Sequence, residues 1–181
     1  MCHLDREDND VATTLISDEM RGAVGTEMDR SVSFAISESD IRKWALAVYH
    51  PEPPPQLFWD AEYAATTRYG GIVAPEDFNP FAWMTPSGPR PAGEDMASPG
   101  SLEALLGIEP PPVRSGLNGG TESEFGVRMR PGDAITSVTR LHSYTEREGR
   151  LGTMLFTITE SNWTNQGDEL VKVVRQTSIR Y

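Results

Sequence analysis

The sequence predicts a single domain of the α+β class, in which helices come first and a run of antiparallel strands follows. The first half holds amphipathic segments that prolines interrupt, and the last third is rich in threonine, valine and aromatic residues. The turn sequences RPGD, REGR and NQGD separate the strand-like segments of that last third. Short turns at regular spacing indicate an antiparallel meander. Helices followed by such a meander favour one sheet with a face packed on a helix.

The first elements are a short strand over residues 31–36 and a helix that begins after Ser37. Ser37 suits the N-cap, and Asp40 stands at the capping-box position. One face of this helix carries the apolar residues at helical spacing, namely Ile41, Trp44, Ala45 and Val48. The helix is expected to end near Tyr49, because Pro51 restricts the residue before it and lacks a backbone donor.

Two further helical segments are predicted before the strands. Asp60 is the expected cap of the first, which the Gly70–Gly71 pair ends. Pro75 suits the first turn of the second, over residues 75–84, although Pro80 should kink or shorten it. The apolar side of that segment, Phe78, Phe81 and Trp83, is the expected filling for the sheet.

The strand-like segments and a change of composition define the expected domain boundaries. Four strands are predicted, over residues 123–129, 134–146, 151–165 and 170–181. An acidic extension without periodicity is expected over residues 1–30, and the folded domain over residues 31–181. Residues 85–112 form a Pro/Gly-rich insertion of that domain, broken by a helical turn around residues 102–106.

Charge and composition exclude several classes of function. The net charge is −11, and residues 1–112 hold 19 acidic and 7 basic residues, against 8 and 9 in residues 113–181. Nucleic acid is therefore not an expected partner, since it requires a clustered basic surface. A small anionic ligand would meet the C-terminal part, which holds Arg128, Arg130, Arg140, Arg147, Arg150, Lys172, Arg175 and Arg180, although these residues can also be solvated strand faces.

No membrane span, secretion signal or metal site is expected. The chain has no apolar run of membrane-spanning length, and its N-terminus is acidic and polar. The only cysteine, Cys2, cannot form an internal disulfide, which favours a cytoplasmic location. Three histidines without clustered spacing argue against a zinc site, so the expected metal set is empty.

Three motifs, in this order, resemble the MaoC-like dehydratase/hydratase family, in particular its N-terminal, fatty-acid-synthase-type half. They are Ala64-x-Thr66-x-Arg68-Tyr69, then Ile72-Val73-Ala74-Pro75, then Arg130-Pro131-Gly132-Asp133. The resemblance covers roughly residues 31–181. It implies the hot-dog fold, a curved antiparallel sheet wrapped around a central α-helix.

The residues that carry the family's chemistry are missing at the matched positions. Catalytic members are implied to use an Asp-x-x-x-x-His pair to move water on or off an α,β double bond, as acid and base. Here Phe58 takes the histidine position, and no such pair occurs in the chain. A glycine amide is implied to bind the thioester oxygen, but Pro75 stands there and has no N–H.

The resemblance therefore predicts a non-catalytic, pocket-shaping subunit of a heteromeric enoyl-thioester hydratase or dehydratase. A second MaoC-like chain would bring the Asp and His, and the substrate would be carried as a coenzyme A (CoA) or acyl carrier protein (ACP) thioester, with no other cofactor. Two alternatives stay open: a stand-alone homodimer that binds acyl thioesters, and a hydratase that uses a displaced pair, His50 and Glu52.

The expected substrate-binding residues lie in the aromatic loop and the segments after it. They are Phe58, Trp59, Tyr69, Gly70, Gly71, Ile72, Phe78 and Trp83. Core packing is the competing explanation for any one of the aromatic residues, because aromatic side chains dominate cores regardless of ligands.

Overall fold

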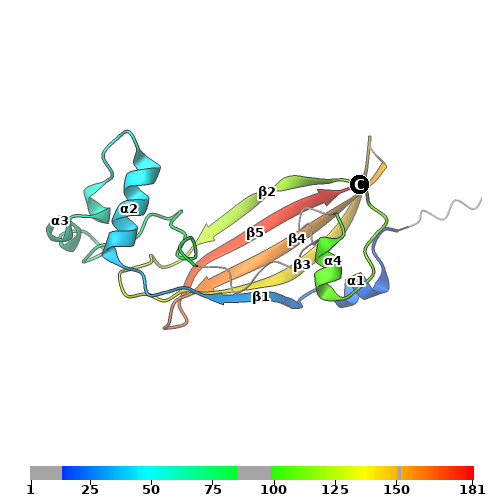
Figure 1. Ribbon diagram of the computed structural model, residues 1–181, viewed down its shortest axis with the longest axis horizontal. Coiled ribbons are helices and arrows are strands. Elements are labelled where there is room, and N and C mark those ends of the chain that lie inside the picture. The colour runs from blue at the N-terminus through cyan, green and yellow to red at the C-terminus, as the bar shows by residue number, and fades with distance from the viewer. Residues whose placement is uncertain (1–13, 85–98, 151) are drawn as a thin grey trace, which may run out of the picture.

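A computed structural model describes residues 14–84, 99–150 and 152–181 of the chain. The described residues form one five-stranded antiparallel sheet with short helices at both ends (Figure 1). The strands are β1 (Glu27–Val32), β2 (Gly116–Phe125), β3 (Thr136–Gly149), β4 (Gly152–Thr164) and β5 (Leu170–Arg180), in the order β1-β3-β4-β5-β2. The predicted α+β class and the antiparallel meander are confirmed.

The two edge strands begin earlier than the sequence patterns indicate. β1 begins at Glu27 rather than at residue 31, so the end of the predicted extension forms part of the sheet. β2 begins at Gly116, seven residues before the predicted start, and ends at Phe125. Its first part contains Gly119 and Gly120, which are typical of loops, and Gly120 has a positive φ of 117° at a shift in register against β5.

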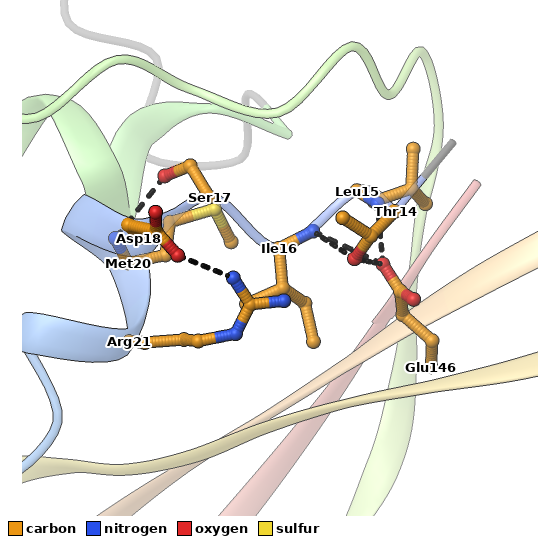
Figure 2. Close-up of polar contacts among 8 residues, drawn as sticks. All are labelled: Thr14, Leu15, Ile16, Ser17, Asp18, Met20, Arg21 and Glu146. Atoms are coloured by element: carbon orange, nitrogen blue, oxygen red, sulfur yellow. Dashed lines mark hydrogen bonds and ion pairs between the residues drawn. The ribbon is translucent and has the colours of Figure 1, made fainter. Parts of the chain in front are cut away.

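The segment before β1 is attached to the opposite end of the sheet from the capped helix α2 (Glu38–Tyr49). One oxygen of Glu146 on β3 accepts hydrogen bonds from the hydroxyl of Thr14 and from the backbone N–H groups of Leu15 and Ile16 (Figure 2). Helix α1 (Asp18–Gly22) follows, and its Met20 is fully buried. Residues 14–32 therefore contribute to the fold, while the rest of the predicted extension lies outside the described residues.

Helices α2 (Glu38–Tyr49) and α3 (Ala61–Ala65) lie beyond one end of the sheet (Figure 1). The predicted capping box is present, since Ser37 Oγ accepts from Asp40 N at 3.1 Å and the Asp40 carboxylate accepts from Ser37. A hydrophobic core, here called the helical core, joins these helices to the nearby strand ends. Its buried members are Ile36, Ile41, Ala45, Phe58, Ala64, Ile72, Val73, Ala74, Phe78, Met129, Ile135 and Val171.

The helix predicted over residues 75–84 is not formed. The segment is a chain of turns, in which the N–H of Phe78 bonds to the carbonyl of Pro75 and the N–H of Met84 to that of Phe81. Pro75 and Pro80 remove backbone donors, and the Asn79 side chain accepts from the N–H of Phe81 at 3.0 Å. These local bonds replace the helical ones, so Phe78 enters the helical core from a turn.

The helix that packs on the sheet is α4 (Ser101–Leu106), six residues long and part of the predicted insertion. Residues 85–98 of that insertion lie outside the described residues. Glu103 is 0% exposed and Arg180 is 4% exposed. They form a bidentate ion pair, in which the two terminal nitrogens of Arg180 donate to the two carboxylate oxygens of Glu103 at 2.6 and 2.8 Å. Arg180 also donates to Thr157 Oγ1 at 2.7 Å, and the hydroxyl of Tyr144 donates to Glu103 at 2.8 Å. A buried polar cluster therefore holds this short helix on the sheet.

Burial raises the pKa of Tyr144 above its usual value, and the hydrogen bond to Glu103 acts in the same direction. Tyr144 therefore stays a neutral donor to the carboxylate. The ion pair and the hydroxyl groups of Thr157 and Tyr144 bond to one another, which offsets most of the cost of burying the two charges.

Glu103→Gln should destabilise the protein by about 3–5 kcal/mol, because it leaves the buried guanidinium of Arg180 without a counter-charge. Urea unfolding followed by circular dichroism measures the loss. The double variant Glu103→Leu/Arg180→Met should recover most of it, since both charges are then removed together.

Asp18→Asn is the matched control for this test. It breaks an exposed ion pair with Arg21, at 2.9 Å, and should cost less than about 1 kcal/mol. Equal losses for Glu103→Gln and Asp18→Asn would show that the buried pair does not hold α4 in place.

Candidate functional site

The face of the sheet that receives α4 is polar over most of its length. Directly opposite residues on neighbouring strands share a face, and Arg180 pairs with Leu155, Ser178 with Thr157, and Gln176 with Thr159. Alternation along β4 places Ser161 and Trp163 on the same face. Its polar middle consists of Thr139, Thr159, Ser161, Gln176 and Ser178.

This polar stretch lies between two covered ends of the sheet face. At one end α4 sits on Thr157 and Arg180. At the other, the ring of Trp163 meets Phe81 edge-to-face, with a centroid distance of 5.1 Å. The six residues of α4 are too few to fill the distance between these ends, because a helix rises only about 1.5 Å per residue.

A groove of about 510 Å³ runs beside α4, and we call it the α4 groove. Its apolar lining comes from Met28 on β1, Leu102 and Leu105 on α4, and Leu117 on β2. Its polar lining comes from Asn118, Thr157, Thr159, Gln176, Ser178 and Arg180. Residues from both edge strands line this space, so the groove lies across the face of the sheet.

A second cavity, of about 650 Å³, lies where α3 and the RPGD turn meet the ends of β2 and β4. We call it the arginine pocket, after Arg68, Arg128 and Arg130, which line it together with Tyr69. Arg68 and Arg128 stand over the Tyr69 ring, with 4.8 and 5.7 Å from guanidinium carbon to ring centroid. Arg130 donates to the Tyr69 carbonyl oxygen at 2.8 Å. Tyr69 therefore organises the three cations.

Carboxylates also line the arginine pocket, and each already has a partner. Glu76 lies 3.0 Å from Nη1 of Arg128. Asp133 accepts from the backbone N–H of Arg130 at 2.7 Å, and Glu169 accepts from the Asn165 side chain at 2.8 Å. Nε of Arg128 is buried without a hydrogen-bond partner among the described residues. The pocket thus keeps donor capacity for an anion.

The loop that replaces the family's catalytic loop is built as a structural element. Residues Gln56–Phe58 form a single 3-10 turn, and Phe58 is buried in the helical core against the ring of Tyr49, 5.9 Å between centroids. Trp59 is 40% exposed, and its Nε1 donates to the Pro54 carbonyl at 3.0 Å. Asp60 caps α3 through the backbone N–H of Tyr63, as predicted.

The two residues of the displaced pair are exposed and form no hydrogen bond or ion pair with each other. His50 follows the last residue of α2, and Glu52 lies in the next turn. Neither side chain forms a hydrogen bond or an ion pair with any other residue that the structure describes. Their role as acid and base remains a prediction that the geometry does not favour.

Pro75 is buried where catalytic members are implied to have a glycine amide. Its carbonyl accepts from Phe78, and the neighbouring Ala74 N–H is already bonded to the Met129 carbonyl at 2.8 Å. Neither residue therefore offers a free amide to a thioester oxygen.

The structure separates the predicted substrate-binding residues into three groups. Phe58, Ile72 and Phe78 are buried in the helical core, for which core packing is the sufficient explanation. Tyr69 lines the arginine pocket. Trp59, Gly70 and Trp83 are exposed and Gly71 is half-buried. These eight residues do not form one common cavity, and their role in substrate binding stays a prediction.

The sequence patterns did not single out the α4 groove. Thr157, Thr159 and Ser178 are ordinary strand residues in the sequence, and only the register of β4 against β5 brings them together. Glu103 did carry a signal, since one carboxylate stands inside the apolar segment SLEALL. Arg128 and Arg130 had been noted as possible anion-binding residues, and the structure adds Arg68.

Similar solved structures define the class of this protein as a hot-dog fold. A chain of the ChsH1–ChsH2 complex from Mycobacterium tuberculosis matches at a TM-score of 0.60 and 18% identity. The match covers 86% of this chain and 84% of the chain in the complex. The (R)-hydratase from A. caviae involved in PHA biosynthesis matches at a TM-score of 0.51 and 15% identity, and the match covers 86% of this chain and 94% of the hydratase chain. A MaoC-like dehydratase matches at a TM-score of 0.54 and 21% identity, and the match covers 88% of this chain and 42% of the dehydratase chain.

A match to a protein family narrows this class. Residues 22–174 match the family described as FAS1-like, dehydratase domain region, so the chain belongs to this family. The resemblance to MaoC-like hot-dog proteins is thereby confirmed. A comparison with curated proteins finds no match. Across the described ranges, no helix combines the length and apolar character that a membrane crossing requires.

Phe58→Ala should destabilise the protein by about 3–5 kcal/mol, because it opens a cavity in the helical core. Trp59→Ala, at the neighbouring exposed position, should cost about 1 kcal/mol through the lost hydrogen bond to Pro54. Urea unfolding compares the two. Similar losses would contradict the assignment of Phe58 to the core.

Arg68→Gln should raise the pKa of Tyr69. The hydrogen bond from Arg68 to the Tyr69 hydroxyl, at 2.6 Å, lowers that pKa below its ordinary value, and Arg128 acts in the same direction. Removing Arg68 therefore leaves less tyrosinate at any alkaline pH below the new pKa. Absorbance titration measures this, with the signal assigned by the difference from Tyr69→Phe.

Arg42→Gln is the control, because Arg42 is exposed on α2. It should leave the tyrosinate titration unchanged. An unchanged titration in Arg68→Gln would mean that the two side chains do not pair in solution.

Proposed function

We propose that this chain is a non-catalytic subunit of a heteromeric enoyl-thioester hydratase or dehydratase, in which it shapes the pocket for the acyl group. One observation carries the proposal: Phe58, at the position of the catalytic histidine, is buried in the helical core. A side chain committed to packing cannot be exchanged for an acid or base without loss of stability. Family membership supplies the reaction class, and the site supplies the reason to seek the chemistry elsewhere.

The partner in this proposal is a second hot-dog chain that carries the Asp-x-x-x-x-His pair. All ten residues of β2 are exposed, and its outer edge has no neighbour among the described residues. Such an edge is a template for another strand. The sheet of this chain would continue across β2 into the partner's sheet. The similarity to the ChsH1–ChsH2 complex, which contains two differently named chains, supports this arrangement.

The arginine pocket is the proposed contact for the thioester carrier. Both CoA and ACP present phosphate groups on a pantetheine arm, and planar guanidinium groups pair with phosphate through two hydrogen bonds at once. The α4 groove is the proposed space for the acyl group. The acid and base would then act on a substrate that this chain holds but does not transform.

Co-expression with a MaoC-like chain that contains Asp-x-x-x-x-His should give a stable complex that hydrates a crotonyl thioester. Each chain alone, assayed by loss of enoyl-thioester absorbance, defines the background. This chain alone should be inactive. His50→Ala and Glu52→Gln should leave the activity of the complex within about twofold, because neither would supply the proton transfers worth about 10²–10⁴-fold.

Variants at the two sheet edges test the interface. Phe125→Glu on β2 should prevent assembly. Val32 is an exposed apolar residue on the opposite edge strand β1, and Val32→Glu should leave assembly intact. Size-exclusion chromatography with light scattering measures assembly. Enzyme-like hydration by this chain alone, lost in His50→Ala, would overturn the proposal, and a stable homodimer that binds acyl thioesters without turnover would favour the stand-alone binder.

A further inference from the structure

We infer that the α4 groove selects an acyl group that carries oxygen atoms along its length over a plain hydrocarbon chain. This inference rests on the proposed function and adds the chemical class of the substrate. It follows from the arrangement of polar and apolar groups around the groove.

The floor of the groove offers hydrogen-bonding groups that the protein leaves unused. Thr159, Gln176 and Ser178 lie on one face of β4 and β5, and none of their side chains forms a hydrogen bond within the described ranges. Thr159 and Ser178 are half-buried and Gln176 is exposed. All three can donate to an acceptor oxygen.

Arg180 lies at the end of the groove that α4 covers. Its terminal nitrogens are engaged by Glu103, Thr157 and the Pro99 carbonyl. Its Nε is buried and has no hydrogen-bond partner in the part of the chain that the structure describes, although Arg180 lines the groove. Because this nitrogen is buried, a ligand oxygen in the groove does not reach it directly. The selectivity therefore rests on the accessible donors of the floor.

The opposite side of the groove is apolar. Leu102 and Leu105 of α4 line it, and Leu105 is more than half exposed. Large exposed apolar side chains beside a row of hydroxyl groups suit a ligand that is apolar on one side and bears oxygens on the other.

The polar floor decides between an alkyl chain and an oxygenated one. An alkyl chain in the groove would strip water from Thr159, Gln176 and Ser178 without replacing the lost hydrogen bonds. An acceptor oxygen replaces them. A site built to form hydrogen bonds rejects an analogue that lacks the partner much more strongly than an apolar site rejects an added polar group.

The test uses pantetheine thioesters, which contain the part that CoA and ACP share. Dodecanoyl-pantetheine is compared with an analogue of equal length in which ether oxygens replace two methylenes. Isothermal titration calorimetry on the full chain should show about tenfold tighter binding of the ether analogue, as expected when several donors of the floor gain acceptors.

Substitutions assign the preference to the groove. In Thr159→Val/Gln176→Leu the preference should fall to about twofold or reverse, because the floor no longer donates. Thr145→Val is the matched control, since Thr145 pairs with Phe156 and so lies on the other face of the sheet. It should keep the wild-type preference. If the double variant does not fold, Ser178→Ala gives the same comparison with a smaller change.

Three outcomes would overturn the inference: equal or tighter binding of dodecanoyl-pantetheine, a preference unchanged by the floor substitutions, or no saturable binding of either thioester. The proposed function is tested separately, since a crotonyl group is too short to use the length of the groove. If the complex hydrates the crotonyl thioester but the chain binds the ether analogue and dodecanoyl-pantetheine equally well, the inference is wrong and the proposed function still holds.

Discussion

The buried ion pair between Glu103 and Arg180 is the interaction on which the shape of the site depends. A hot-dog sheet has to cover one face, and here a helix of six residues does so at one end only. So short a helix cannot hold its place by apolar burial alone, because few of its residues reach the sheet. A carboxylate and a guanidinium joined by two hydrogen bonds, with Thr157 and Tyr144 as further partners, fix it at one position. Such a pair contributes specificity of placement more than net stability.

The same constraint explains why the sheet face is polar. Beneath a long apolar helix, Thr159, Gln176 and Ser178 would be buried without partners, which is costly. With a short helix they stay accessible, and the cost does not arise. The polar floor and the short helix therefore require each other. Phe58 and Phe78 show the complementary case, since both are buried in the helical core at the other end of the molecule.

Local chemistry accounts for what the sequence could predict. The capping box at Ser37 and Asp40 and the cap at Asp60 are decided within a few residues, and both are present. The helix predicted over 75–84 failed where local signals conflicted, because its apolar spacing suggested a helix while Pro80 and Asn79 favoured turns. The glycines in β2 were misleading for a different reason: pairing with β5 outweighs their low strand preference.

The candidate site could be predicted only in part, because it is made of long-range contacts. The loss of the Asp-x-x-x-x-His pair is visible in the sequence, whereas the α4 groove exists only once β4, β5 and α4 are in register. Arg180 shows the difference. In the sequence it is one of several arginines in a strand, but in the fold it joins a helix 77 residues away and leaves one buried N–H facing no protein acceptor. A residue that both fixes the helix and lines the groove couples the stability of the fold to the shape of the groove, so a substitution at Arg180 would change both.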